Sequence, residues 1–193
     1  MSNFIAVGFA HIVSVDALDH LLFLAALAAC YRPRDWRHGL TVATAFTVGH
    51  SITLALASLG VIVFNTAVVE FLIPVTIVIA GIENLVQRRD RPGGPVRPIL
   101  AGAFGLVHGA GFANILRDLF DGGFAMPLLG FNIGIELGQI LILGVLITAF
   151  TLFDRAVQVW EPEIITATRL RSRIASVAVA SVAVVIAAGR TPW

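Results

Sequence analysis

The sequence contains no lysine, only one cysteine and few charged residues of either sign. Because Cys30 is alone, no disulfide can form within the chain. Charged side chains make up 13% of the residues, 58% are hydrophobic, and the net charge is +1. A soluble domain carries about a quarter charged residues, so this chain has too little polar surface to cover a globule in water. The composition therefore predicts a protein that is surrounded by lipid.

The basic residues are all arginines, and they cluster between apolar runs rather than along one face. Nucleic-acid binding needs a basic face or stripe, so we expect no nucleic-acid partner. A chain of 193 residues is short enough for one domain, and we treat residues 1–193 as a single transmembrane domain.

A helix that crosses a bilayer needs about 20 mostly apolar residues. Six segments meet this requirement: 5–31, 39–60, 66–87, 97–117, 124–152 and 173–190. The first is interrupted by Ser14, Asp16, Asp19 and His20, so we expect a kinked or broken helix over residues 9–31. The predicted fold class is therefore all-α, a polytopic transmembrane bundle of about six helices.

Arginines are concentrated in every second link between the predicted helices. Eleven of the 13 lie in or beside the links that follow the first, third and fifth helices. The positive-inside rule assigns these links to the cytoplasm, so both chain termini are expected on the outer side. We expect a multi-pass protein of the bacterial inner membrane. Residues 154–172 fit either an amphipathic surface helix or a polar loop.

Ionisable side chains inside membrane helices usually face the protein interior and serve function. Seven occupy such positions here: His11, Asp16, Asp19, His20, His50, His108 and Glu136. The helix rise places four of them near the bilayer midplane: His20, His50, His108 and Glu136. Two others, His11 and Asp16, are expected nearer the outer mouth, and Glu83 with Asn84 nearer the inner end.

Helical spacing directs several polar side chains to shared faces. Asn132, Glu136 and Gln139 lie at i, i+4 and i+7 of one segment. Helix bundles build metal sites from side chains on facing helices, so the pattern predicts a metal or proton site. Five further polar residues are assigned to a transport path or to support of the ligands: Ser51, Glu83, Asn84, Asn132 and Gln139.

Imidazole and carboxylate ligands suit borderline divalent ions such as nickel, cobalt, zinc or iron. Copper(I) prefers sulfur, and Cys30 and Met126 lie near the membrane faces, so copper is less favoured. The residues leave three functions open. The first is a metal permease, the second a membrane-embedded zinc or iron enzyme with Ser51 and Glu136 as acid–base groups, and the third a haem-binding assembly subunit.

Several motifs resemble the HupE/UreJ family of membrane proteins. The run Phe-Gly-Leu-Val-His that ends at His108 is one, and the Asp-His pair at Asp19 and His20 is another. Together the similar stretches cover residues 8–14, 17–23, 44–54, 82–84, 104–113 and 130–139. The spacing between His11 and the Asp-His pair is longer here than in many members.

The resemblance implies a small helical nickel or cobalt permease, often linked to hydrogenase or urease maturation. It also implies a set of functional positions: His11, Asp19, His20, His50, Glu83, His108 and Glu136. The expected partners are the metal ion and the lipid bilayer, with a homo-oligomer and a metalloenzyme-maturation partner both open. A permease is favoured over an enzyme, and the enzyme alternative stays open.

Overall fold

The computed structural model describes residues 2–86, 94–117, 125–160 and 167–192, except the side chains of Ser2 and of residues 113–117. Within these residues the chain forms helices and no strand, which confirms the all-α prediction. The seven α-helices are α1 (Ser2–Val13), α2 (Leu18–Ala28), α3 (Trp36–Ser58), α4 (Thr66–Val86), α5 (Val96–Arg117), α6 (Ala125–Trp160) and α7 (Ala167–Gly189). Two short 3-10 helices, η1 (Val15–Ala17) and η2 (Pro33–Asp35), precede α2 and α3.

The predicted break in the first segment is present. Helices α1 and α2 are bent by 55° relative to each other around η1. The Ser14 hydroxyl accepts a hydrogen bond from the backbone N–H of Asp16 at 3.1 Å, which offers the chain an alternative to continuing the helix. The polar residues that made this segment a poor straight span are therefore also the ones that turn it.

The last two helices extend beyond their predicted bounds. We expected them over residues 124–152 and 173–190, but α6 continues to Trp160 and α7 begins at Ala167. Arg171 forms an ion pair with Asp154 at 2.9 Å and also donates to the Tyr31 carbonyl oxygen at 2.9 Å. These partners let the charged side chains of Asp154 and Arg171 lie within helices, although the sequence suggests that both residues belong to a link. Residues 161–166, which include part of the predicted amphipathic segment, lie outside the described residues.

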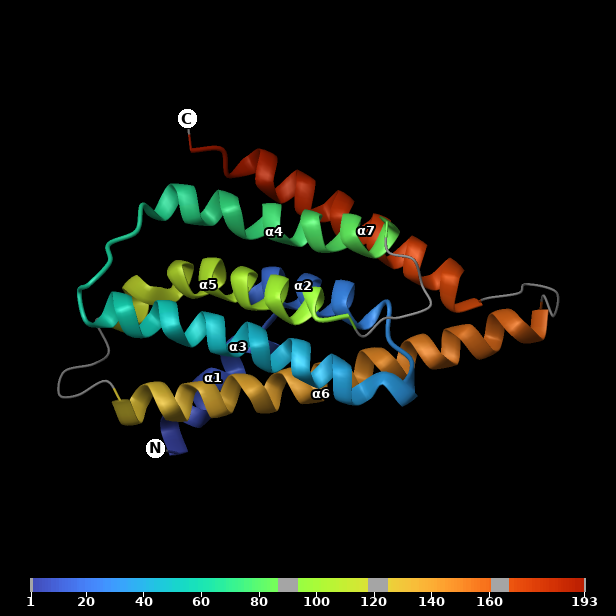
Figure 1. Cartoon of the computed structure of the whole chain (residues 1–193), viewed down its shortest axis with the longest axis horizontal. Helices are drawn as coiled ribbons and strands as arrows, with labels where there is room; N and C mark the ends of the chain where they lie inside the picture. The colour runs from blue at the N-terminus through green and yellow to red at the C-terminus, as the bar shows by residue number, and fades with distance from the viewer. Residues whose placement is uncertain (1, 87–93, 118–124, 161–166, 193) are drawn as a thin grey trace.

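Glycines bring pairs of helices into backbone contact. A Cβ atom on Gly134 of α6 would overlap the Ile5 carbonyl oxygen of α1, and one on Gly105 of α5 would overlap the Phe46 carbonyl oxygen of α3. Small residues allow this close approach. The bundle consequently contains the closely packed pairs α1–α6 and α3–α5, together with α4–α7, while α2 contacts α4, α6 and α7 (Figure 1).

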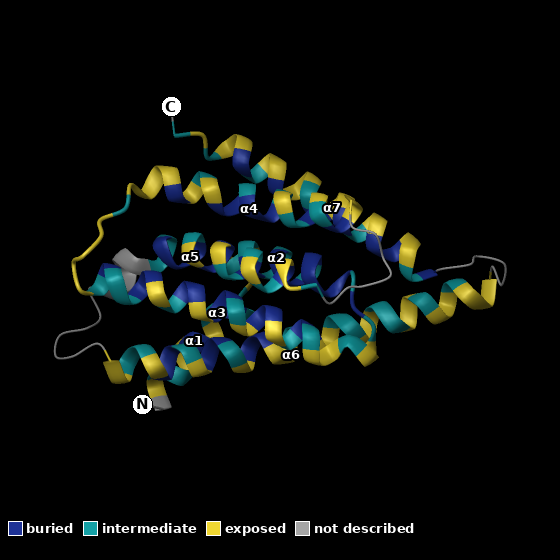
Figure 2. Cartoon of the chain, viewed as in Figure 1, coloured by how far each residue is buried: buried dark blue, intermediate teal, exposed yellow. Residues whose placement is uncertain are grey.

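Many large apolar side chains are exposed, as expected for helices that face lipid. Figure 2 shows exposed residues (yellow) along the outer helices α4, α6 and α7. By length and composition, α4, α6, α7 and the segment Pro33–Ser58 can each cross a membrane, and the bent pair α1–α2 can form a fifth span. In α5 the apolar stretch Val96–Phe112 is shorter. The helices thus suit a multi-pass membrane protein. The start of α1 and the end of α7 lie toward the same end of the bundle (Figure 1), while six spans and outward-facing termini stay predictions.

Candidate metal centre

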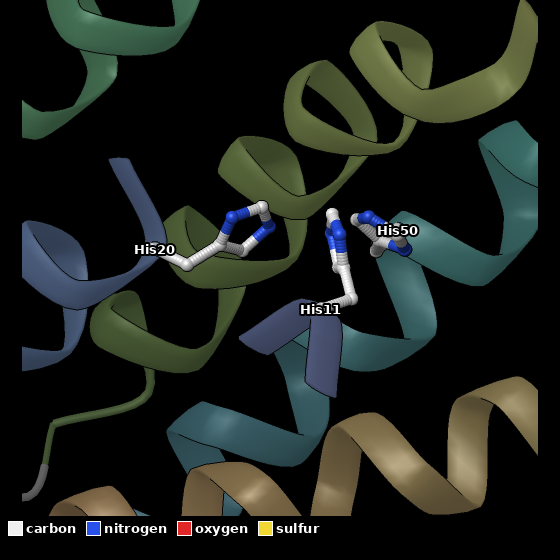
Figure 3. A group of neighbouring side chains, drawn as sticks. All are labelled: His11, His20 and His50. Carbon is white, nitrogen blue, oxygen red and sulfur yellow. The ribbon is translucent and has the colours of Figure 1, made fainter. Parts of the chain in front are cut away.

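Three histidines that are far apart in the sequence converge inside the bundle. His11 lies near the end of α1, His20 in the first turn of α2 and His50 in the second half of α3. Each offers a ring nitrogen, and these three atoms lie within 4.8 Å of one another. Figure 3 shows the three rings gathered together, and their centroids lie 4.9 to 6.3 Å apart. This spacing would let one ion contact all three rings after small side-chain movements.

The backbone explains why these side chains meet. The bend between α1 and α2 brings His11 and His20 to the same place, with their ring centroids 4.9 Å apart. His50 is held in place by α5, because Gly105 and Gly109 of that helix lie directly against the His50 backbone. Added Cβ atoms at either glycine would collide with α3. The position of the centre therefore depends on one helix break and one glycine-lined contact.

The imidazole nitrogens of this centre lack hydrogen-bond partners among the described residues. The atoms concerned are Nε2 of His11, Nε2 of His20 and both ring nitrogens of His50. His50 is fully buried and His20 is 8% exposed. Buried polar atoms without partners are rare because each costs about 1–3 kcal/mol. Their concentration at one point indicates a site built to bind a ligand.

His108 lies beside the three converging histidines as a fourth imidazole. Its Nδ1 is 2.9 Å from the Phe104 carbonyl oxygen, which can only accept a hydrogen bond. A neutral His108 therefore carries its proton on Nδ1 and directs the lone pair to Nε2, which is buried and has no partner among the described side chains and backbone. Its ring centroid is 5.3 Å from that of His20. Such a bond to the far nitrogen is how proteins orient histidine ligands.

Aromatic rings surround the histidines. Phe112 lies 4.3 Å from His11 between ring centroids, and Phe46 lies 5.0 Å from His108 and 6.0 Å from His20. Phe131 packs near His11 and is fully buried. These rings exclude water and offer no strong ligand atom of their own. An ion at this centre would thus depend on the histidines and on any carboxylate that reaches them.

Asp19 is the carboxylate most closely associated with the centre. It directly precedes His20 in the first turn of α2. One carboxylate oxygen accepts a hydrogen bond from Arg190 at 3.0 Å, whereas the other is buried without a partner in the described part of the chain. Arg190 follows the end of α7, so this ion pair also ties α7 to the start of α2.

Asp16 and Glu136, two further predicted ligands, are engaged elsewhere. Asp16 is exposed and its carboxylate accepts a hydrogen bond from Ser14. Glu136 accepts hydrogen bonds from the hydroxyls of Thr44 and Thr47, between α3 and α6. Neither residue belongs to the group of three histidines whose ligand atoms converge. The predicted midplane set is therefore divided, with imidazoles in one cluster and Glu136 in another.

The remaining predicted path residues divide in the same way. Gln139 Oε1 lies 3.0 Å from the Thr47 hydroxyl, the same group that bonds Glu136, and so belongs with Glu136, while the Ser51 hydroxyl donates to the Thr47 carbonyl oxygen at 2.6 Å. Asn132 Oδ1 is buried without a partner among the described residues. Glu83 and Asn84 lie in a separate network near the end of α4, where both accept hydrogen bonds from Arg97.

Sequence reasoning does not single out two arginines that lie near the site. Arg97 and Arg190 both pair with carboxylates predicted as functional, Glu83 and Asp19. Their signal in the sequence is weak, because arginines at helix ends ordinarily mark the membrane interface. What distinguishes Arg97 is its burial, at 5% exposed, which only the packing of the helices shows.

The fold and the converging histidines define a class, an all-α, multi-pass membrane protein with a histidine cluster that could hold a metal ion. The chain matches the family model described as HupE / UreJ protein over residues 1–189, and it belongs to this family. Searches of curated proteins and of solved structures each found no significant match. The family assignment therefore rests on a match over nearly the whole chain.

Proposed function

We propose that this protein is a membrane permease for a divalent transition-metal ion, with nickel or cobalt as the preferred cargo. The observation that carries the proposal is the convergence of three buried histidine nitrogens within 4.8 Å, without hydrogen-bond partners among the described residues. The chain belongs to the HupE / UreJ family. The resemblance of its motifs to that family implies nickel or cobalt transport, which supports the same cargo.

The donor chemistry fits such a cargo. Neutral imidazoles bind nickel, cobalt and zinc, whereas magnesium and calcium require oxygen ligands. Cys30, the ligand that copper(I) would favour, lies in contact with Ser172 rather than with the histidines. His11, His20 and His50 would hold the ion, His108 would serve as a fourth ligand, and Asp19 would balance its charge.

The neighbouring structure suggests a route through the protein. We propose that the ion enters past the exposed Asp16 at the break between α1 and α2, and then reaches His11. A pocket on the other side of the centre is lined by Phe23 and Phe104 and extends to Glu83. A path that continues beyond the histidines is expected of a permease, whereas an enzyme needs only one opening.

The test is metal uptake by the full chain in liposomes that contain a nickel- or cobalt-sensitive dye. We expect His20→Ala and His50→Ala each to lose bound metal and to reduce uptake more than about 100-fold, because ligand removal exceeds the usual cost of losing a supporting residue. His38→Ala is the matched control, since His38 lies beside Tyr31 outside the centre.

Two results would contradict the permease. One is full metal content and uptake in both His20→Ala and His50→Ala. The other is a stoichiometric ion that the wild-type protein binds but does not release or transport, which would favour the metalloenzyme.

A further inference from the structure

A buried ion pair lies on the side of the histidine centre that is expected to face the cytoplasm. Arg97 of α5 places two guanidinium nitrogens on the two carboxylate oxygens of Glu83 in α4, at 3.1 and 2.8 Å. Arg97 is 5% exposed, so this pair is largely removed from solvent. Fork-shaped pairing of this kind is stronger and more directional than a single charged hydrogen bond.

The pair is fixed by neighbours from two more helices. Arg97 also donates to the Asn84 side-chain oxygen at 2.6 Å. The Asn84 amide in turn donates to the Ala26 carbonyl oxygen of α2 at 2.7 Å and to the Ser176 hydroxyl of α7 at 3.1 Å. Helices α2, α4, α5 and α7 therefore meet at one hydrogen-bonded point. We call Glu83, Asn84 and Arg97 the inner network.

A pocket extends from the inner network toward the histidine centre, although none of its lining residues is a histidine. Glu83, Asn84 and Arg97 line one part of it, and Phe23 and Phe104 line another. Phe104 supplies the carbonyl oxygen beside His108 Nδ1, and the Phe23 ring lies 6.1 Å from the His108 ring. An ion that left the histidines on this side would consequently meet the guanidinium of Arg97.

From these contacts we propose that Arg97 is the inner gate of the metal path, an inference that rests on the permease function proposed above. A fixed positive charge at a constriction repels cations, as arginines do in selective pores. Arg97 also forms the ion pair with the Glu83 carboxylate, and without that pair the carboxylate would attract a divalent ion. Passage therefore requires Arg97 to leave Glu83, and the ion then takes the place of the guanidinium beside the carboxylate.

The gate makes a prediction that depends on the sign of the charge removed. Arg97→Gln leaves a negative carboxylate at the constriction, so metal uptake should rise about tenfold. Glu83→Gln leaves an unbalanced guanidinium, so uptake should fall about tenfold. A pair with a purely structural role predicts the same direction for both, because each substitution breaks the same contact.

The experiment measures initial rates of nickel and cobalt uptake into liposomes, together with equilibrium binding of the same ions in detergent. Binding at the histidines should stay within about threefold of wild type in both variants, since ligand losses are expected to cost far more. Asp154→Asn is the matched control, because Asp154 also pairs with a buried arginine, Arg171, but does not line the pocket. Its uptake should equal that of the wild type.

A second pair of variants keeps the test decisive if Arg97→Gln does not fold. Arg97→Lys retains the charge and should keep uptake low, and Glu83→Gln should still slow it. Uptake that falls equally in Arg97→Gln and Glu83→Gln, or that changes in neither, overturns the gate alone. A wild-type protein that binds and transports neither ion overturns the permease, and the gate with it.

Discussion

The histidine centre and the inner network are both buried and polar, yet they differ in how completely their atoms are bonded. His11, His20 and His50 bring together nitrogens that lack partners within the described chain. In the inner network, by contrast, Arg97 and Asn84 connect four helices through hydrogen bonds of 2.6 to 3.1 Å, and Arg97 Nη1 is the one nitrogen of these two side chains without a partner among the described residues. Unsatisfied atoms cost stability and await a ligand, whereas satisfied atoms hold the fold.

The two regions also differ in what holds them in place. The inner network is held by its own bonds, whereas the histidines are positioned by helix backbones around them. Gly105 of α5 contacts the backbone at Phe46 and His50, and the bend at η1 orients His11 and His20. The centre should therefore be sensitive to changes in helix packing that leave every histidine intact.

Among the substitutions that keep every histidine, Gly105→Ala is expected to have the largest effect on stability and metal binding. It adds a methyl group where the Phe46 carbonyl oxygen already lies. Because backbone cannot yield as a side chain can, α3 must move away from α5, at a cost of about 3 kcal/mol or more. His50 moves with α3, so nickel or cobalt binding should weaken at least about tenfold. Thermal unfolding in detergent and equilibrium metal binding measure the two effects.

Gly144→Ala provides the matched control, because nothing lies within 4 Å of a Cβ atom at Gly144. Alanine favours helix over glycine, so this variant should be as stable as the wild type or slightly more so. Unchanged metal binding and stability in Gly105→Ala would show that helix packing does not position the histidines.

Much of the architecture could be predicted from the sequence, and the reasons are physical. Apolar length identifies helices that suit a membrane, and the polar residues at 14–20 predicted the break between α1 and α2. The convergence of His20 and His50 could be anticipated from their similar depth along separate helices. These inferences succeed because hydrophobicity and helix rise are local properties.

Other features depend on rotation and pairing, which one sequence does not display. Glu136 was expected beside the histidines because its depth was suitable, but its helix directs it toward Thr44 and Thr47. Asp154 and Arg171 were read as link residues, although mutual pairing lets both lie within helices. The sequence places Arg97 beside a link between helices, but its pairing with Glu83 lets it lie buried in α5. A charged residue can be assigned to the surface or the interior only when its partner is known.

A smaller effect, on stability rather than on metal binding at the histidines, is expected from Asn84→Ala. The substitution removes the acceptor for Arg97 and the donor to Ala26 and Ser176. Leaving such buried groups unpaired costs about 1–3 kcal/mol, so the thermal unfolding midpoint should fall. Metal binding at the histidines should change less than about threefold, because none of these atoms is a ligand.

Asn132→Ala is the matched control for that variant, since Asn132 Oδ1 has no hydrogen-bond partner among the described residues. Its unfolding midpoint should fall less than that of Asn84→Ala. If Asn84→Ala instead loses metal binding while keeping its stability, the contrast between a binding centre and a structural network is wrong.

The smallest effect is expected at Glu70, a carboxylate that belongs to neither region. Glu70 is exposed in α4 just beyond the first turn, where the helix dipole has little effect on a charge. Glu70→Gln should therefore reduce stability by less than about 1 kcal/mol and leave nickel or cobalt uptake unchanged. Thermal unfolding and liposome uptake, compared with Glu83→Gln in the same preparation, measure both quantities. Because the two substitutions are chemically identical, uptake that slows only in Glu83→Gln would assign the effect to the position of the carboxylate in the path. Equal slowing in both would instead point to a general effect of charge on the ion concentration at the membrane surface.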